Sequence, residues 1–82
     1  MQYFKIVGGL TAIYAIAYSD INGKNFCSTL PWILSDFTSE ANVRENVAYL
    51  ICKGYKNVIP FKFKEKEKEE EFNWDYVNLH KI

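Results

Sequence analysis

The chain has 82 residues, a hydrophobic fraction of 49%, an aromatic fraction of 17%, and a formal net charge of zero. This length fits one domain, residues 1–82, and the apolar and aromatic content excludes a disordered chain. The balanced charge argues against a general polyanion-binding protein, which would be plainly basic.

Two turn signals divide the N-terminal part of the chain into three predicted strands. The segments Tyr3–Val7, Leu10–Ile21 and Lys24–Leu30 are rich in β-branched and aromatic residues. Gly8-Gly9 and Asn22-Gly23 separate them, and both dipeptides suit two-residue type I′ turns, which need positive φ at both central positions. The sequence therefore predicts an antiparallel three-stranded meander.

A single helix is predicted after the meander. Thr38 or Ser39 can cap its first turn, and Gly54 supplies the left-handed residue that ends it. One apolar stripe runs along this helix and consists of Val43, Val47, Leu50 and Ile51. The opposite, polar face carries Asn42, Arg44, Glu45 and Asn46.

Three C-terminal segments complete the predicted α+β fold. Val58–Phe63 is predicted as a fourth strand, which lies at an edge or carries a bulge because Pro60 cannot donate to a ladder. Lys64–Glu71 is a charge run, either a solvated tip or helix start, or an acidic patch that meets a basic partner. The aromatic segment Phe72–Leu79 fits a strand or a helical face, and we favour a strand because Asn and Asp weaken a helix.

The predicted turns also indicate which side chains share a face of the sheet, because same-face residues recur at every second position. The first face collects Phe4, Ile6, Ile13, Ala15, Ala17 and Phe26. We expect the helix to pack there, since the small Ala15 and Ala17 leave space for it. The second face collects Tyr3, Lys5, Val7, Leu10, Tyr14, Ile16 and Tyr18.

The second face is too apolar for an ordinary solvated surface, and it is the candidate site. Its predicted partner-binding residues are Tyr3, Lys5, Tyr14, Ile16 and Tyr18. Three interpretations stay open. The C-terminal segment covers the face, or it is an interface for a partner protein or a second copy of the chain, or it is a stacking platform for single-stranded nucleic acid. The neutral charge and the scarcity of arginine disfavour the last interpretation.

No pattern in the sequence indicates catalysis, a cofactor, a metal or a small-molecule substrate. His80 is the single histidine, and Cys27 and Cys52 lack metal-binding or redox spacing. We expect two free thiols in a reducing cytoplasm. No basic leader follows Met1, and the longest apolar stretch, Leu10–Tyr18, is too short to span a membrane.

One stretch resembles part of a known family. The segment LPWILSDFTSEANVRENVAYL, with Leu30-Pro31 before a helix that begins at Thr38/Ser39-Glu40, resembles HicB-type antitoxins. The Gly-Cys that follows the proline in that family is missing here, so we infer no membership.

The expected function is that of a non-catalytic protein-interaction module. A small cytoplasmic regulator or inhibitor, antitoxin-like or phage anti-defence-like, would act by occupying a partner's surface. The alternative is a single-stranded nucleic-acid-binding domain that uses an aromatic sheet face.

Overall fold

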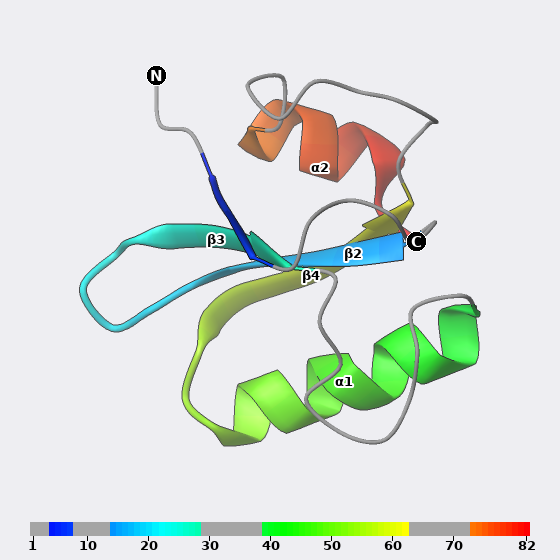
Figure 1. The fold of residues 1–82 in the computed structure, drawn as a ribbon, viewed down its shortest axis with the longest axis horizontal. Helices are drawn as coiled ribbons and strands as arrows, with labels where there is room; N and C mark the ends of the chain where they lie inside the picture. The colour runs from blue at the N-terminus through cyan, green and yellow to red at the C-terminus, as the bar shows by residue number, and fades with distance from the viewer. Residues whose placement is uncertain (1–3, 8–13, 29–38, 63–72) are drawn as a thin grey trace.

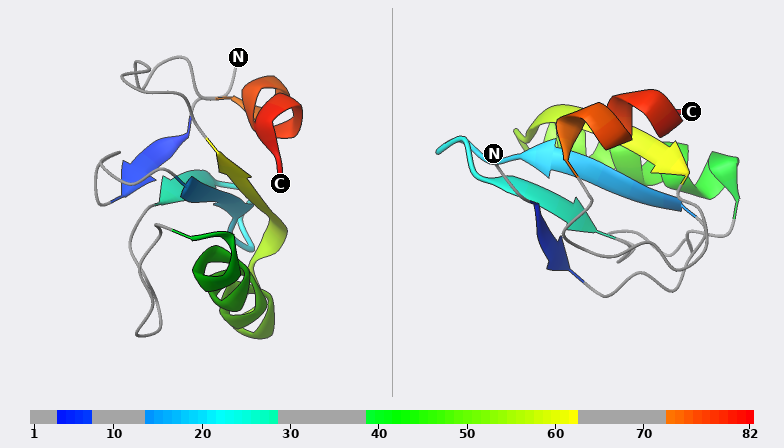
Figure 2. Two further views of the ribbon diagram at one scale, coloured as in Figure 1. Left: turned by 90° about the vertical axis from the view of Figure 1, so that its right-hand side faces the viewer. Right: turned by 90° about the horizontal axis from the view of Figure 1, so that it is seen from above.

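The computed structural model describes residues 4–7, 14–28, 39–62 and 73–82, which form a four-stranded sheet between two helices (Figure 1). The strands are β1 (Lys5–Val7), β2 (Tyr14–Ser19), β3 (Asn25–Ser28) and β4 (Lys56–Lys62), and the helices are α1 (Glu40–Cys52) and α2 (Trp74–His80). Figure 2 shows the two helices on opposite faces of the sheet. The predicted α+β class, with antiparallel strands and a helix on one sheet face, is confirmed.

The strand order is β1-β3-β2-β4. Strand β2 is antiparallel to both β3 and β4, whereas β1 lies parallel to β3, with Ile6 opposite Cys27. The predicted hairpin between the first two strands is therefore wrong. Because β3 and β4 occupy both edges of β2, β1 takes the free edge of β3 instead. The predicted turn at Gly8-Gly9 lies outside the described residues.

The hairpin between β2 and β3 forms as predicted, but its turn is one residue longer. The Asp20 N–H donates to Lys24 O at 3.0 Å, and the Gly23 N–H donates to Asp20 O at 3.1 Å. Gly23 has a φ of 79°. Asn22 does not have the positive φ that a type I′ turn requires, because among the described residues other than glycine only Asn57 does. A loop of three residues ending in a left-handed glycine replaces the predicted type I′ turn.

This longer turn shifts the register and changes the face on which Phe26 lies. Ser19 is opposite Asn25 and Tyr18 is opposite Phe26, whereas the predicted turn pairs Ser19 with Phe26. A shift of one residue moves a side chain to the other face of a strand. The Asp20 carboxylate favours the longer turn by accepting hydrogen bonds from the backbone N–H groups of Asn22 and Lys24, at 2.9 and 2.8 Å.

Helix α1 has both predicted ends. The Ser39 hydroxyl accepts a hydrogen bond from the backbone of the first turn at 3.3 Å. At the other end, Gly54 has a φ of 95°, and the Tyr55 N–H donates to Leu50 O at 3.2 Å. This pattern is a Schellman motif, which lets Tyr55 fold back onto Leu50.

The buried face of α1 differs from the predicted stripe. Val43, Asn46 and Leu50 are buried, whereas Ile51 is 58% exposed. Asn46, assigned above to the polar face, is fully buried, and its side-chain amide donates to Asn42 O at 2.9 Å. Positions 43, 46 and 50 share one helical face, and the hydrogen bond offsets the cost of burying an amide there.

Strand β4 is an edge strand, as the proline predicts. Pro60 lies opposite Ile16, and the ladder to β2 is irregular beside Asn57, whose φ is 55°. The C-terminus adds to the outer side of β4, because the Ile82 N–H donates to Pro60 O at 3.2 Å. A bulge and an added C-terminal segment both limit pairing with other chains at this edge.

The described part of the C-terminal aromatic segment forms helix α2, so the preference for a strand is wrong. Asn73 caps α2 by accepting a hydrogen bond from the Tyr76 N–H at 2.9 Å. Asp75 lies in the first turn, where the helix dipole favours an anion, and Asn78 is exposed. The polar residues thus take positions where a helix tolerates or prefers them.

The core has one layer on each side of the sheet, and α1 covers the opposite face from the one predicted for it. The layer between α2 and the sheet contains Phe4, Ala15, Ala17, Cys27, Phe61 and, from the helix itself, Val77. The layer between α1 and the sheet contains Ile16 and Tyr18 from β2 and Val43 and Leu50 from the helix. Aromatic rings fill the space beside the two alanines, including Phe4, whose ring meets Trp74 edge-on at 4.8 Å.

Candidate functional site: the hairpin end

The predicted partner-binding face is largely buried in this structure. Ile16 is fully buried and Tyr18 is 5% exposed, both beneath α1, while Tyr14 is half-buried. Lys5 lies in β1, where its backbone alone is described, and Tyr3 is outside the described residues. Helix α1, not the C-terminal segment, covers this face. Partner binding through it stays a prediction, one that would require α1 to move.

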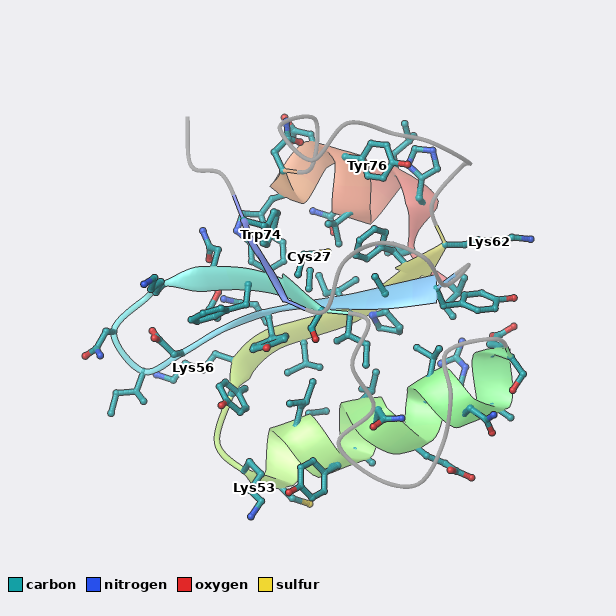
Figure 3. The ribbon with its side chains drawn as sticks, viewed as in Figure 1. Cys27, Lys53, Lys56, Lys62, Trp74 and Tyr76 are labelled. Atoms are coloured by element: carbon teal, nitrogen blue, oxygen red, sulfur yellow. The ribbon has the colours of Figure 1, made fainter. Side chains whose placement is uncertain are left out.

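A different part of the surface presents aromatic and basic side chains together. It lies at the β2–β3 turn and the neighbouring start of β4, and we call it the hairpin end. Its residues are Ile21, Lys24, Phe26, Lys53, Tyr55 and Lys56. Figure 3 shows Lys53 and Lys56 on the same side of the molecule as the β2–β3 turn, with Lys62 at the opposite side.

Three aromatic rings form the base of the hairpin end. Phe26 stacks on Tyr18, with ring centroids 5.4 Å apart and an interplanar angle of 17°. Tyr55 meets the same Tyr18 ring edge-on at 4.9 Å. Tyr18 is buried, whereas Phe26 and Tyr55 are each partly exposed. The register of the hairpin and the Schellman motif of α1 therefore bring two aromatic side chains to the surface from different elements.

The buried Tyr18 serves as packing and not as an acid or base. Burial, together with the nearby Tyr55, raises the pKa of its hydroxyl to about 12, although a hydrogen bond with Ser28 acts in the opposite direction. A phenol with such a pKa stays protonated near neutral pH.

The lysines of the hairpin end are exposed and have no described ion-pair partner. Lys24 Nζ lies 5.8 Å from the ring centre of Phe26, and Lys53 Nζ lies 5.3 Å from that of Tyr49. Asp20, at the start of the same turn, accepts two backbone hydrogen bonds. Among the described residues of the hairpin end and its turn, three lysines therefore accompany one carboxylate.

The described residues that bear reactive groups do not converge on the hairpin end. Cys27 and Cys52 are both free thiols, one buried and one exposed. Burial raises the pKa of the Cys27 thiol to about 12, which makes it a poor nucleophile near neutral pH. His80 stacks on Tyr76 within α2, with ring centroids 4.2 Å apart. In the described ranges, no group of three or more His, Cys, Asp or Glu residues could hold a metal ion.

Sequence reasoning missed the hairpin end because it assigned Phe26 to the opposite face. A usable signal was present. In Asp20-Ile21-Asn22-Gly23, the aspartate takes the first position and the glycine the last position of a type I turn. That pattern predicts the longer loop, and with it the pairing of Phe26 with Tyr18.

The fold and the surface define a small α+β domain whose sheet lies between two helices. No known protein family, curated protein or solved structure matches the chain. In the ranges that the structure describes, neither helix has the length and apolar character needed to cross a membrane.

Proposed function

We propose that the protein is a non-catalytic protein-interaction module that binds a partner through the hairpin end. The observation that carries this proposal is the apolar surface at one end of the sheet. Ile21 is 82% exposed at the tip of the turn, and the rings of Phe26 and Tyr55, which both contact the buried Tyr18, are partly exposed. Aromatic side chains on a buried base are typical anchors of protein interfaces.

The hairpin end favours a protein partner over single-stranded nucleic acid. Nucleobases stack on free aromatic ring faces. The ring of Phe26 already has Tyr18 stacked on it and Lys24 above it. The central strands offer no open sheet face either, because α1 and α2 lie over opposite sides (Figure 1).

The proposed role is that of a cytoplasmic regulator or inhibitor, antitoxin-like or phage anti-defence-like, which acts by occupying its partner's surface. The absence of converging reactive groups in the described ranges supports a non-enzymatic role. Two free thiols support a reducing compartment. The partner is another protein in this proposal, and a second copy of the chain is the alternative.

A capture experiment with matched variants tests the proposal. The immobilised chain is incubated with lysate of the organism that encodes it, and bound proteins are quantified by mass spectrometry. Ile21→Ser removes the exposed tip, and Leu79→Ser removes a similarly exposed side chain, 79% accessible, from α2. We expect Ile21→Ser to lower recovery of the specific partner about tenfold, which corresponds to about 1.4 kcal/mol.

The control decides how the result is interpreted. Leu79→Ser should recover the partner as well as the unmodified chain does. Equal recovery by all three proteins, or a loss confined to Leu79→Ser, would exclude the hairpin end as the interface. Sedimentation equilibrium of the purified chain distinguishes self-association from binding to another protein. A dimer that forms through the hairpin end should dissociate in the Ile21→Ser variant.

A further inference from the structure

We propose that Asn22 is a site of chemical modification, where loss of the side-chain amide gives aspartate and isoaspartate, and that the Asp20 carboxylate restrains this reaction. The reaction belongs to the β2–β3 turn itself and needs no binding partner. Asn22 and Gly23 are adjacent in that turn, and both are exposed. The hydrogen bonds that close the turn determine how readily the two residues react.

The reacting groups are the side-chain carbonyl carbon of Asn22, Cγ, and the backbone nitrogen of Gly23. Glycine has no Cβ to obstruct the approach of its nitrogen. Apart from its chain neighbours, no heavy atom lies within 4 Å of the position that a Cβ of Gly23 would take. Both residues are exposed, so water reaches them. The two groups therefore meet few steric obstacles, and the solvent supplies the other reactants.

The chemistry needs only water and its hydroxide ion. Hydroxide removes the proton of the Gly23 N–H, the nitrogen forms a bond to Asn22 Cγ, and the side-chain nitrogen takes a proton from water and leaves as ammonia. Water then hydrolyses the resulting cyclic imide. Cleavage of the bond from nitrogen to Cγ gives aspartate, whereas cleavage of the bond to the main-chain carbonyl carbon gives isoaspartate.

The hydrogen bonds of the turn oppose the first step. The Gly23 N–H donates to Asp20 O at 3.1 Å, so the attacking nitrogen must give up this bond before it reacts. The Asp20 carboxylate also accepts hydrogen bonds from the N–H groups of Asn22 and Lys24, at 2.9 and 2.8 Å, which holds the residues on both sides of Gly23. Its negative charge disfavours a deprotonated nitrogen nearby. The reaction therefore requires a local opening of the turn.

The other asparagines lack this combination of exposure and a following glycine. Asn25 is buried, and its Oδ1 accepts a hydrogen bond from the Ser19 hydroxyl at 2.8 Å. Asn57 is exposed like Asn22, but Val58 follows it, and the branched Cβ of valine crowds the attacking nitrogen. The remaining asparagines belong to α1 or α2 or cap α2. Asn57 is therefore the internal control for Asn22.

Isoaspartate would change the turn that places Phe26 against Tyr18. The main chain would then run through the former side-chain carbon of residue 22, which lengthens the backbone of the loop. The length of this loop determines the register of β2 and β3, in which Tyr18 is opposite Phe26. We therefore expect the isoaspartate form to have weaker packing between these two rings.

The test is incubation of the purified full-length chain at mildly alkaline pH. Peptide mass spectrometry measures the fraction of each asparagine converted, and enzymatic methylation with isoaspartyl methyltransferase measures isoaspartate. We expect conversion of Asn22 to be several-fold faster than conversion of Asn57, with both products present. The rate should rise with pH, because hydroxide removes the proton of the attacking nitrogen.

Matched variants test the restraint by the Asp20 carboxylate. Asp20→Ala, with its fold verified by circular dichroism, should convert Asn22 several-fold faster than the unmodified chain does. Asp75→Ala, which removes an exposed carboxylate from the first turn of α2, is the control and should leave the rate unchanged. In concentrated urea, where the turn is lost, all three proteins should convert Asn22 at one common, faster rate.

The contrary outcomes separate the two parts of the proposal. Conversion of Asn22 that is no faster than that of Asn57, or that gives aspartate without isoaspartate, would overturn the modification site. Equal rates in the folded chain and its folded Asp20→Ala variant would overturn the restraint. If Asp20→Ala does not fold, the unmodified chain decides, because conversion as fast in buffer as in urea would overturn the restraint as well.

Discussion

Asn46 is a polar residue on the buried face of α1. It is a fully buried amide in a layer of apolar side chains, and it donates a hydrogen bond to Asn42 O. Removing a donor from a buried site and adding charge there are both costly.

The variant Asn46→Asp should therefore lower the free energy of unfolding by at least about 2 kcal/mol at neutral pH. The loss should be smaller at acid pH, where the introduced carboxyl group is protonated in both states. Chemical denaturation followed by circular dichroism measures both effects. Ala48→Asp, at an exposed position of the same helix, is the control and should cost no more than about 1 kcal/mol. Equal losses in the two variants would contradict the burial of Asn46.

The two thiols should differ sharply in reactivity. Cys52 is exposed and should react quickly with a thiol reagent such as dithionitrobenzoate in the folded protein. Cys27 should react only after unfolding, because it is buried and its thiol stays protonated. Cys52→Ser should remove the fast phase and leave the slow one. A fast reaction of Cys27 in the folded protein would show that α2 does not cover the sheet as described.

Stability should fall at alkaline pH because of two buried groups. Burial raises the pKa of the Cys27 thiol from 9.0 to about 12 and that of the Tyr18 hydroxyl from 10.0 to about 12. The unfolded chain releases these protons at lower pH than the folded protein does. Their contribution to stability is therefore intact below about pH 9 and is lost as the pH rises toward 12. Denaturant titrations across this range should show a shallower decline for Cys27→Ala, and an unchanged slope would contradict the assignment.

At the scale of elements, the β2–β3 turn determines which residues reach the hairpin end. Gly23 has a φ of 79°, and no atom lies within 4 Å of the position that a Cβ would take. Any penalty for a larger residue at this position is therefore a backbone penalty.

The variant Gly23→Val should cost more than about 1 kcal/mol, because a β-branched residue resists this conformation. Asn22→Ala should cost little, since the loop of three residues does not need positive φ at that position. Thermal unfolding of the two variants distinguishes the turns. A type I′ turn would make both substitutions costly.

Helix α2 offers an internal comparison of its buried and exposed faces. Val77 is fully buried against the sheet, whereas Leu79 is 79% exposed. Val77→Asp should destabilise the protein by about 3 kcal/mol or more and increase binding of a hydrophobic dye, because it places a charge in the core. Leu79→Asp should change neither property. If the two variants behave alike, α2 does not pack as described.

The sequence was sufficient to predict local features of the helix and of the edge strand. Ser39 and Gly54 mark the ends of α1 through hydrogen bonds within a few residues, and Pro60 excludes a central strand by its own chemistry. The faces were not predictable in the same way. One extra residue in a turn relocates Phe26, and the choice of face for each helix depends on packing between distant segments.

The C-terminal helix shows a related limit. Asn73 and Asp75 lower the average helix propensity of their segment, but one is the cap and the other lies in the first turn. Average propensity misled the prediction because the value of each residue depends on its position along the helix. The candidate site was missed because of the turn, although Tyr18, on which Phe26 and Tyr55 pack, was among the predicted site residues.

At the scale of the whole molecule, the covering of both sheet faces is the reason why we propose one end of the sheet as the interface. Trp74 and Tyr76 (Figure 3) pack against the layer beneath α2, and Ile16 and Tyr18 are buried on the α1 side. The hairpin end has an exposed apolar tip and exposed lysines.

Nuclear Overhauser contacts between methyl groups test this central claim most directly. The account predicts contacts from Val77 to Ala15 and Ala17, and from Leu50 to Ile16, because each pair shares a core layer. Contacts from Leu50 to the two alanines would contradict it. Helix α1 would then lie on the other face, and Ile16 and Tyr18 would be open to a partner.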